Sequence, residues 1–433
     1  MPFVALMFFI NFLDRTAISF AAPHGMTDDL GLTAAQFGFA SGVFFIGYIL
    51  LEIPSNLALH RFGARVWLAR IMITWGIVAV LFTWVQTATQ LYWLRFLLGV
   101  AEAGFFPGAI LFLSLWVPAR HRAKVLGLFY LAQPLTTAVG APLAGFLIQA
   151  HGLFGLEGWR VMFLGVGLPA VIVGVLCLWV LKENPHEASW LTEEEAAWLS
   201  NELDHEAKKT EEKHKVSTWE TFTNGRVWLL SIIYFGFIYG LYALSFFLPT
   251  IVAGFRDQVG SLNSLTEGII TGTPYIFAAI VLYCWSRLVQ KQGLQKWHIV
   301  APAIAGGVCI PLALVVVDNP IATMVLVTVT ACSIFAVLPN FWTLPTQFLT
   351  GAAAAAGVAL INTLGNIAGF SSGYVTGFLK DHTGDYLIPM IVTGGFMVLS
   401  GLLLLAMRRT SEVDASEADS SAEAVTTSTQ TLS

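Results

Sequence analysis

The sequence predicts an all-α membrane protein with twelve transmembrane helices in two six-helix bundles and both termini in the cytoplasm. The first observation behind this prediction is composition: 56% of the 433 residues are hydrophobic and only 11% are charged, whereas a soluble chain carries about 25% charged residues. The second is that 11 of the 27 acidic residues lie between Glu183 and Glu220. The third is that the apolar segments are long and continuous. Together these observations exclude a water-soluble enzyme, a disordered chain, a nucleic-acid-binding protein and an outer-membrane barrel.

Twelve apolar segments, bounded by charges, glycine or proline, are long enough to cross a bilayer, which takes about 20 residues. The first segment continues past Asp14 with no basic region before it, so we expect a membrane span and not a cleaved signal peptide. The predicted spans are 2–22, 34–57, 66–86, 90–115, 123–149 and 159–181, followed by 226–253, 266–289, 297–317, 320–341, 346–378 and 386–407.

A strongly polar stretch separates the two sets of six spans. Its segment TEEEAAWLSNELDHEAKKTEEKHK alternates acids and bases at helical spacing, which predicts surface helices in water. The end of the chain is rich in Ser, Thr, Ala and acids and is predicted to be disordered. The chain therefore divides into a first bundle at 1–182, a cytoplasmic linker at 183–225, a second bundle at 226–408 and a cytoplasmic tail at 409–433.

Basic residues indicate the orientation of the array. Loops on the side opposite the termini hold only Arg160, Arg256 and Lys380. The other side is much richer in Lys and Arg, as expected of the cytoplasmic face. Its junctions carry Arg61, Arg65, Arg70, Arg120, Arg122, Lys124, Arg287, Lys291 and Lys296.

Four ionisable residues lie deep in the first bundle: Asp14 and Arg15 in the span 2–22, and Arg95 and Glu102 in the span 90–115. A charge at mid-membrane costs roughly 2.5–3.5 kcal/mol, so such residues usually have a function. Arg95 and Glu102 are seven residues apart, hence on one helix face and about 10.5 Å apart along the axis. Structural ion pairs that hold these two spans together are the alternative interpretation.

The charges of this set suggest a coupling mechanism. With both carboxylates ionised the set sums to zero, and with both protonated it sums to +2. The cavity would then attract an anion most strongly when protonated, so a proton gradient could drive anion uptake. The planar guanidinium groups of Arg15 and Arg95 suit bidentate binding of a carboxylate. Two parallel six-span repeats would place this site at the midplane between them.

Five motifs give the chain a family resemblance over residues 11–408. They are NFLDRT at 11–16, GYILLEIPSN at 47–56, FGAR at 62–65, RFLLGVAEAGFFPG at 95–108 and GAAAAAGVALINTLGN at 351–366. In these motifs the sequence resembles the major facilitator superfamily and, within it, the anion:cation symporter family. SWLTEEE at 189–195 is similar to the linker of phthalate, tartrate and hydroxyphenylacetate permeases.

The resemblance implies proton-coupled uptake of a small organic anion, such as a hydroxy acid, a sugar acid or an aromatic acid. It implies that Asp14 and Glu102 carry the coupling protons. It also implies a substrate site formed by residues of both bundles: Arg15, Arg95, Tyr48, Gln133, Asn362 and Trp342.

Two groups of residues are candidates for gating. The loop after the span 34–57 carries Arg61, Gly63 and Arg65, although His60 stands where the superfamily usually has an acid before its arginine. The span 123–149 contains small residues and a proline that would form a flexible gate against the span 34–57, or would simply allow close helix packing. These residues are Gly140, Pro142 and Gly145.

No catalytic, metal or cofactor site is expected. The four cysteines and nine histidines lack ligand spacing, no nucleophile–base arrangement is visible, and protons are the expected coupling ion. The expected partners are a small organic anion and the lipid bilayer, without nucleic acid, and a monomer is expected to function. Two alternatives remain at this point: an efflux antiporter for lipophilic drugs or cations, and a non-transporting carboxylate receptor that signals through residues 183–225.

Overall fold

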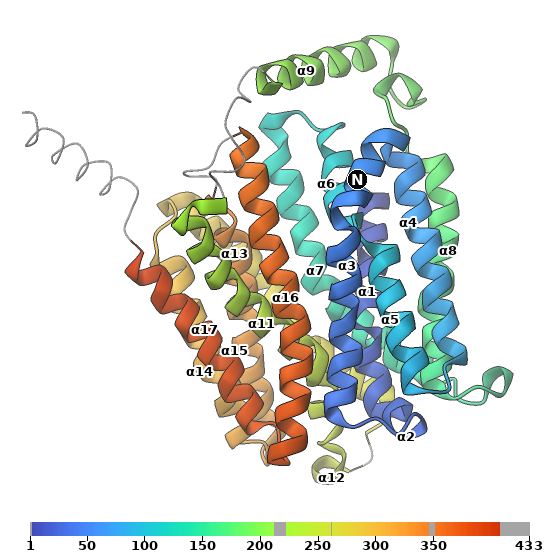
Figure 1. Cartoon of the computed structure of the whole chain (residues 1–433), viewed down its shortest axis with the longest axis vertical. Helices are drawn as coiled ribbons and strands as arrows, with labels where there is room; N and C mark the ends of the chain where they lie inside the picture. The colour runs from blue at the N-terminus through green and yellow to red at the C-terminus, as the bar shows by residue number, and fades with distance from the viewer. Residues whose placement is uncertain (1, 212–221, 261, 346–350, 408–433) are drawn as a thin grey trace, which may run out of the picture.

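The computed structural model describes residues 2–211, 222–260, 262–345 and 351–407, and these form helices with short connections (Figure 1). The first bundle consists of α1 (Pro2–Ala21), α3 (Ala34–Phe62), α4 (Ala64–Leu81), α5 (Ala88–Glu102), α6 (Phe105–Ser114), α7 (Ala119–Ile148) and α8 (Gly158–Val180). The second consists of α11 (Gly225–Ala253), α13 (Ser264–Gln292), α14 (Trp297–Val315), α15 (Pro320–Phe341), α16 (Gly351–Thr383) and α17 (Leu387–Ala406).

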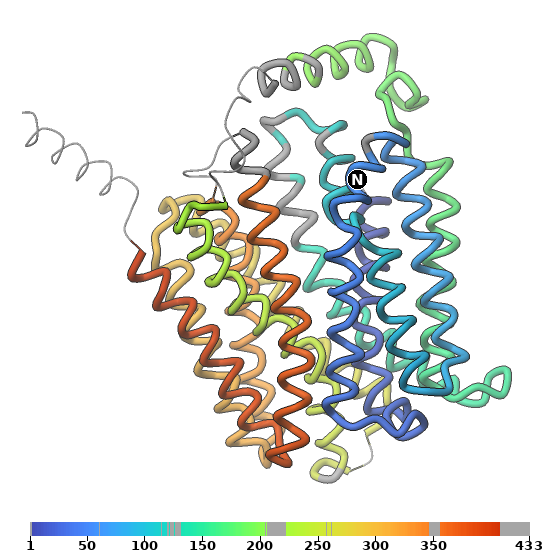
Figure 2. Tube along the Cα trace, viewed as in Figure 1, coloured from blue at the N-terminus to red at the C-terminus, as the bar shows by residue number. Residues whose placement is uncertain are grey.

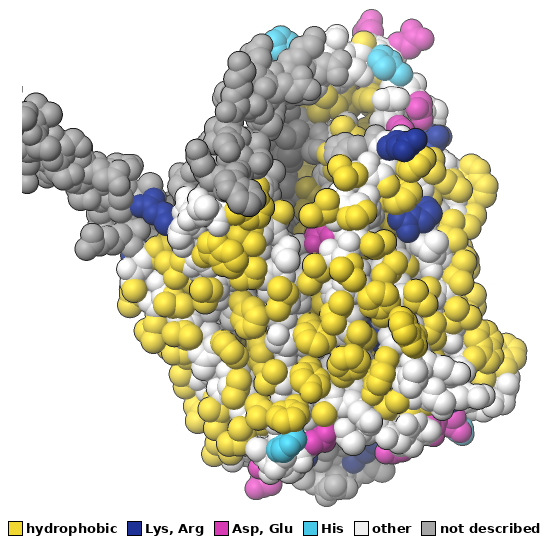
Figure 3. Space-filling model, in the orientation of Figure 1, with side chains coloured by type: hydrophobic (Ala, Val, Ile, Leu, Met, Phe, Trp, Pro, Cys, Tyr) yellow, Lys and Arg dark blue, Asp and Glu magenta, His cyan; other side chains and the backbone are white. Residues whose placement is uncertain are grey.

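The predicted twelve-helix membrane fold is confirmed. Within the described residues, 11 segments are long and apolar enough to cross a membrane, and α16 completes the second set of six. Hydrophobic side chains cover most of the middle of the face in Figure 3, whereas most of the charged side chains lie toward its two ends. This distribution matches a protein whose middle is surrounded by lipid.

Helices outside the two bundles mark the two ends of the molecule. The linker helix α9 (Glu193–Glu211) lies across one end, as the polar pattern of the linker predicts, and we call this the α9 end (Figure 1). The helices α2 (Met26–Asp29) and α12 (Arg256–Val259) lie at the opposite end, the α2 end. The predicted tail at 409–433 lies outside the described residues. Single-turn 3-10 segments complete the fold at Ala22–His24, Phe82–Trp84, Leu153–Gly155 and Pro185–Glu187.

One predicted span differs from the structure. Residues 90–115 do not form a continuous helix, because α5 ends at Glu102 and α6 begins at Phe105. Ala103 is extended (ψ 131°) and Gly104 has a φ of +84°, a conformation that favours glycine. The carbonyl of Ala103 has no helical partner because Pro107 lacks an amide hydrogen, and the Ser55 hydroxyl donates to it at 2.6 Å.

The two bundles meet along two seams, α3 against α16 and α7 against α13 (Figure 2). Toward the α2 end the backbones touch. A Cβ atom on Gly38 would lie 2.1 Å from the carbonyl oxygen of Gly373, and one on Gly145 would lie 2.2 Å from that of Ser264. Only glycine fits at such separations, so both seams are closed at this end.

Polar contacts reinforce the closure at the α2 end. The Asp381 carboxylate on α16 accepts hydrogen bonds from the Ala34 and Ala35 amides, at 3.0 and 2.8 Å, and so satisfies the first turn of α3. On the other seam, Glu267 of α13 binds the Arg256 guanidinium and lies 2.9 Å from Nε2 of His24 in the first bundle. The structure is therefore a conformation in which the bundles are joined at the α2 end.

Candidate functional site

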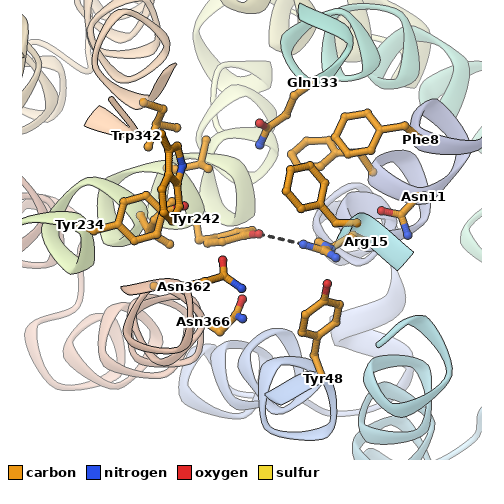
Figure 4. A pocket seen from close by; sticks show the side chains of 16 residues that line it. Phe8, Asn11, Arg15, Tyr48, Gln133, Tyr234, Tyr242, Trp342, Asn362 and Asn366 are labelled. Carbon is orange, nitrogen blue, oxygen red and sulfur yellow. Dashed lines mark hydrogen bonds between the residues drawn. The ribbon is translucent and has the colours of Figure 1, made fainter. Parts of the chain in front are cut away.

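A cavity lies between the bundles, with walls from α1, α3, α6 and α7 on one side and α11, α15 and α16 on the other (Figure 4). Arg15 is the only charged side chain among the described residues that line it. The remaining lining is aromatic, aliphatic or neutral polar: Phe8, Asn11, Phe12, Tyr48, Phe106, Gln133, Tyr234, Ile238, Leu241, Tyr242, Leu338, Trp342, Asn362, Gly365 and Asn366. One cation in a largely apolar lining suits a small organic anion.

Arg15 joins both bundles at this cavity. One guanidinium nitrogen forms an ion pair with Glu102, and another donates to the Tyr242 hydroxyl of α11 at 3.1 Å. The guanidinium carbon also lies 5.4 Å from the centre of the Tyr48 ring, a cation–π distance. Arg15 is partly exposed to the cavity while Glu102 is fully buried behind it, so the arginine faces any occupant.

Two carboxyl groups lie behind Arg15 with unused acceptor atoms. Both Asp14 oxygens, and Oε2 of Glu102, are buried and have no hydrogen-bond partner among the described residues. An ionised carboxylate without donors is expensive to bury, and the cost falls when it takes up a proton. The break after Glu102 places its carboxylate at the end of α5, where it reaches Arg15.

Arg95 lies elsewhere, contrary to the expectation that it faces the substrate. It is fully buried between α5 and α3, where its Nε and Nη2 donate to the Ala40 and Ser41 carbonyls at 3.1 and 3.2 Å. A Cβ on Gly99 would lie 1.9 Å from the carbonyl oxygen of Phe44. This close helix packing brings the α3 carbonyls within reach of Arg95. Two nitrogens of its guanidinium group are therefore already hydrogen-bonded to α3.

The other predicted substrate residues come together. Tyr48, Gln133, Asn362 and Trp342 all line the cavity from four different helices or helix ends, and the Trp342 ring centre lies 4.9 Å from that of Tyr234.

Four residues of the lining with hydrogen-bonding side chains were absent from the sequence prediction. Asn11 and Asn366 each lie one helical turn from a predicted residue, so helical spacing could have indicated them. Tyr234 and Tyr242 carry no such signal, because only the meeting of α11 with α1 brings Tyr242 to Arg15.

The predicted gating residues lie in two places. Gly63 (φ +84°) separates α3 from α4, a Cβ there would lie 2.2 Å from the Glu183 carboxylate, and Arg65 lies 3.6 Å from Glu187. The Arg61 guanidinium lies 5.5 Å from the Phe62 ring centre. The loop between α3 and α4 therefore contacts the start of the linker.

In α7, Pro142 and Gly145 contact α13, whereas Gly140 contacts Leu13 of α1. The expected pairing of this span with 34–57 is therefore corrected: α7 meets α13, and α3 meets α16.

A family model described as Major Facilitator Superfamily matches residues 4–373. The chain belongs to the major facilitator superfamily. A protein of Agrobacterium vitis, named as a proposed tartrate transporter, is 43% identical over 94% of this chain and 93% of its own length. The quinolone resistance transporter of Acinetobacter baumannii is 37% identical over 93% and 91%, and the inner membrane transport protein RhmT of Escherichia coli is 34% identical over 94% and 93%.

Solved structures share the fold of this superfamily member. A bacterial homologue of the human lysosomal transporter Spinster, in an inward-facing and occupied conformation, matches with a TM-score of 0.74 at 18% identity, covering 94% of this chain and 95% of that one. A D-xylose–proton symporter matches with a TM-score of 0.71 at 16% identity, covering 93% and 95%. The chain is a multi-pass inner-membrane transporter of organic substrates, not an enzyme.

Proposed function

We propose that this transporter is a proton-coupled symporter that takes up a small organic anion, a mono- or dicarboxylate, by alternating access. The observation that carries the proposal is the Arg15–Glu102 ion pair at the cavity wall. A guanidinium that faces the cavity is suited to a carboxylate, and its internal partner is an acid that a proton can neutralise. The relative named for tartrate transport supports the substrate class.

The contacts around Arg15 suggest the order of events. While Glu102 is ionised it holds Arg15, and the arginine is less available to an anion. A proton on Glu102 weakens that ion pair, so Arg15 can bind the substrate carboxylate together with the Tyr48 and Tyr242 hydroxyls. Asp14, which accepts no hydrogen bond from described residues, is the second proposed proton carrier. Arg95 is proposed to position α3 against α5, because its donors bind α3 carbonyls.

The bound anion would link the two bundles, since Arg15 and Tyr48 belong to the first and Tyr242 to the second. The anion would enter while the α9 end is closed and the α2 end is open, and it would be released after the α2 end has closed and the α9 end has opened. We propose that the α9 end faces the cytoplasm, because the basic junction with Arg61, Arg65 and Arg70 adjoins the linker.

Drug export is the second candidate function. Aromatic rings of Phe8, Phe106, Tyr234 and Trp342 line one part of the cavity, and one relative is named as a quinolone resistance transporter. An aromatic wall suits flat lipophilic compounds, but a cavity for cations would be expected to present acids in place of Arg15.

A binding panel followed by transport tests the proposal. Purified protein is heated with tartrate, a sugar acid, phthalate, hydroxyphenylacetate, a neutral sugar and a lipophilic cation at mildly acidic pH. A ligand at 100 times its Kd adds about 2.7 kcal/mol of stability, so a shift confined to carboxylates is expected. Proteoliposomes with an inward proton gradient should then accumulate the same acid, and a protonophore should abolish the accumulation. Stabilisation by the lipophilic cation alone would contradict anion uptake and favour export.

A further inference from the structure

Glu52 is a half-buried acid that the proposed coupling does not use. It lies on α3 one helical turn after Tyr48 and does not line the cavity. Its carboxylate reaches across to α16, where Oε1 accepts from the Asn362 amide nitrogen at 2.8 Å and Oε2 faces that of Asn366 at 3.5 Å. Both asparagines line the cavity, so Glu52 binds the two amides from behind the cavity wall.

This arrangement fixes which way each amide points. An ionised carboxylate only accepts hydrogen bonds, whereas an amide has a donating nitrogen at one end and an accepting oxygen at the other. With both nitrogens turned to Glu52, the two carbonyl oxygens are left for other partners. Asn362 and Asn366 are one turn apart on α16, so they present two acceptors along one wall, across the cavity from Arg15 (Figure 4).

The two walls of the cavity therefore differ in hydrogen-bonding character. The first-bundle wall offers donors: the Arg15 guanidinium and the Asn11 amide nitrogen, which has no partner among the described residues. On the second-bundle wall, the α16 face with Asn362 and Asn366 offers the two amide oxygens, whereas Tyr242 of α11 carries a donor that faces Arg15. A carboxylate fits beside Arg15 and is disfavoured at the α16 face, where a hydroxyl group can donate.

We propose that Glu52 determines substrate specificity by holding the Asn362 and Asn366 oxygens toward the cavity, which selects organic anions that carry hydroxyl groups beyond their carboxylate. The inference rests on the proposed binding of a carboxylate by Arg15. Glu52 acts through the two asparagines and is a positioning residue. If Glu52 only held α3 against α16, its substitution would instead change the Kd of all substrates by the same factor.

Tartrate and succinate are a suitable pair of probes, because they share the four-carbon dicarboxylate chain and differ by two hydroxyl groups. Hydrogen bonds to two amide oxygens are expected to favour tartrate by about 10- to 100-fold in Kd. In Glu52→Gln, the side-chain amide can offer an oxygen to only one asparagine, so the other turns its nitrogen to the cavity. Because one of the two acceptors is lost, the tartrate-to-succinate preference should fall about threefold to tenfold.

The experiment is calorimetric titration of purified wild-type and variant proteins with each acid. Glu157→Gln is the matched control, because that acid pairs with His151 on an exposed loop and should leave the preference unchanged. Glu52→Asp keeps an acceptor-only group and should retain most of the preference. If both acids bind Glu52→Gln in the wild-type ratio, the role of Glu52 is wrong while anion binding stands.

A second variant keeps the inference testable if Glu52→Gln does not fold. Asn366→Leu removes one acceptor at similar volume, so it should weaken tartrate about tenfold and leave succinate within about twofold. Equal loss of both acids would contradict the acceptor wall. If neither acid binds the folded wild-type protein, the proposed dicarboxylate site itself fails, and this result is distinct from an unchanged ratio.

Discussion

The two helix bundles have the same architecture but differ in the chemistry that they bring to the cavity. The first bundle supplies Asp14, Arg15 and Glu102, together with Arg95 between its own helices. In the described part of the second bundle no charged side chain lines the cavity, and the wall consists of phenols, amides, an indole and aliphatic groups. The difference suggests that the first bundle binds the charged group of the substrate and the coupling protons, whereas the second bundle recognises the rest of the substrate.

The strongest test of this comparison removes the charge from the first wall. Arg15→Gln should weaken carboxylate binding at least 30-fold, because loss of one partner of a buried charge pair costs roughly 2–5 kcal/mol. Titration calorimetry measures this directly. Arg95→Gln is the contrast: it should lower thermal stability by about 2 kcal/mol through lost hydrogen bonds to α3 and leave Kd within about threefold. Equal loss of affinity in both variants would place both arginines in the site.

A substitution in the seam between α7 and α13 is expected to have the next largest effect. Gly145→Val would bring a side chain against the Ser264 carbonyl, so the closure at the α2 end cannot form and uptake should fall more than tenfold. Gly395→Val on α17 is the matched control, because nothing lies within 4 Å of a Cβ there. Uptake by proteoliposomes, with distances between spin labels at the ends of α7 and α13, measures both effects. Wild-type uptake by Gly145→Val would show that this closure is not needed for the cycle.

Coupling is expected to depend on an acid of the first bundle. Glu102→Gln mimics the protonated acid, so it should bind substrate but lose the roughly tenfold accumulation that one pH unit can drive when one proton is coupled. Wild-type binding should tighten as pH falls, since proton uptake by Glu102 frees Arg15, whereas binding by the variant should vary less with pH. Accumulation and Kd across a pH series measure these effects, and normal accumulation by the variant would remove Glu102 from the coupling.

The smallest effect is expected when the hydrogen bond between Arg15 of the first bundle and Tyr242 of the second is removed. Tyr242→Phe deletes the acceptor of Arg15 on α11, and a hydrogen bond to a charged group contributes about 1.5 kcal/mol. Kd should therefore rise by about tenfold without loss of proton coupling. Tyr374→Phe on α16, outside the cavity lining, should leave Kd unchanged. Loss of accumulation in Tyr242→Phe would mean that the second bundle also takes part in coupling.

The sequence was most informative where one helix carries the signal. Hydropathy placed the helices, and the depth of Asp14, Arg15 and Glu102 indicated buried charge in the first bundle. The pattern could not show that α5 stops at Glu102, because Gly104 and Pro107 also occur in continuous membrane helices. It correctly put Arg95 and Glu102 on one face, but which neighbour each one meets depends on the close approach of α3 at Gly99. The Arg15–Tyr242 contact depends on how the two bundles dock, and no local pattern encodes that.

The Asp381 carboxylate, which accepts hydrogen bonds from the first amides of α3, also has a consequence for the balance between open and closed states. When the α2 end opens, the Ala34 and Ala35 amides lose their acceptor on the opposite bundle, and water replaces it, since the site is already exposed to solvent. Helix capping by a side chain contributes about 0.5–2 kcal/mol. The outer rim of the seam would thus stabilise the conformation closed at the α2 end by up to this amount, independently of what the central cavity holds.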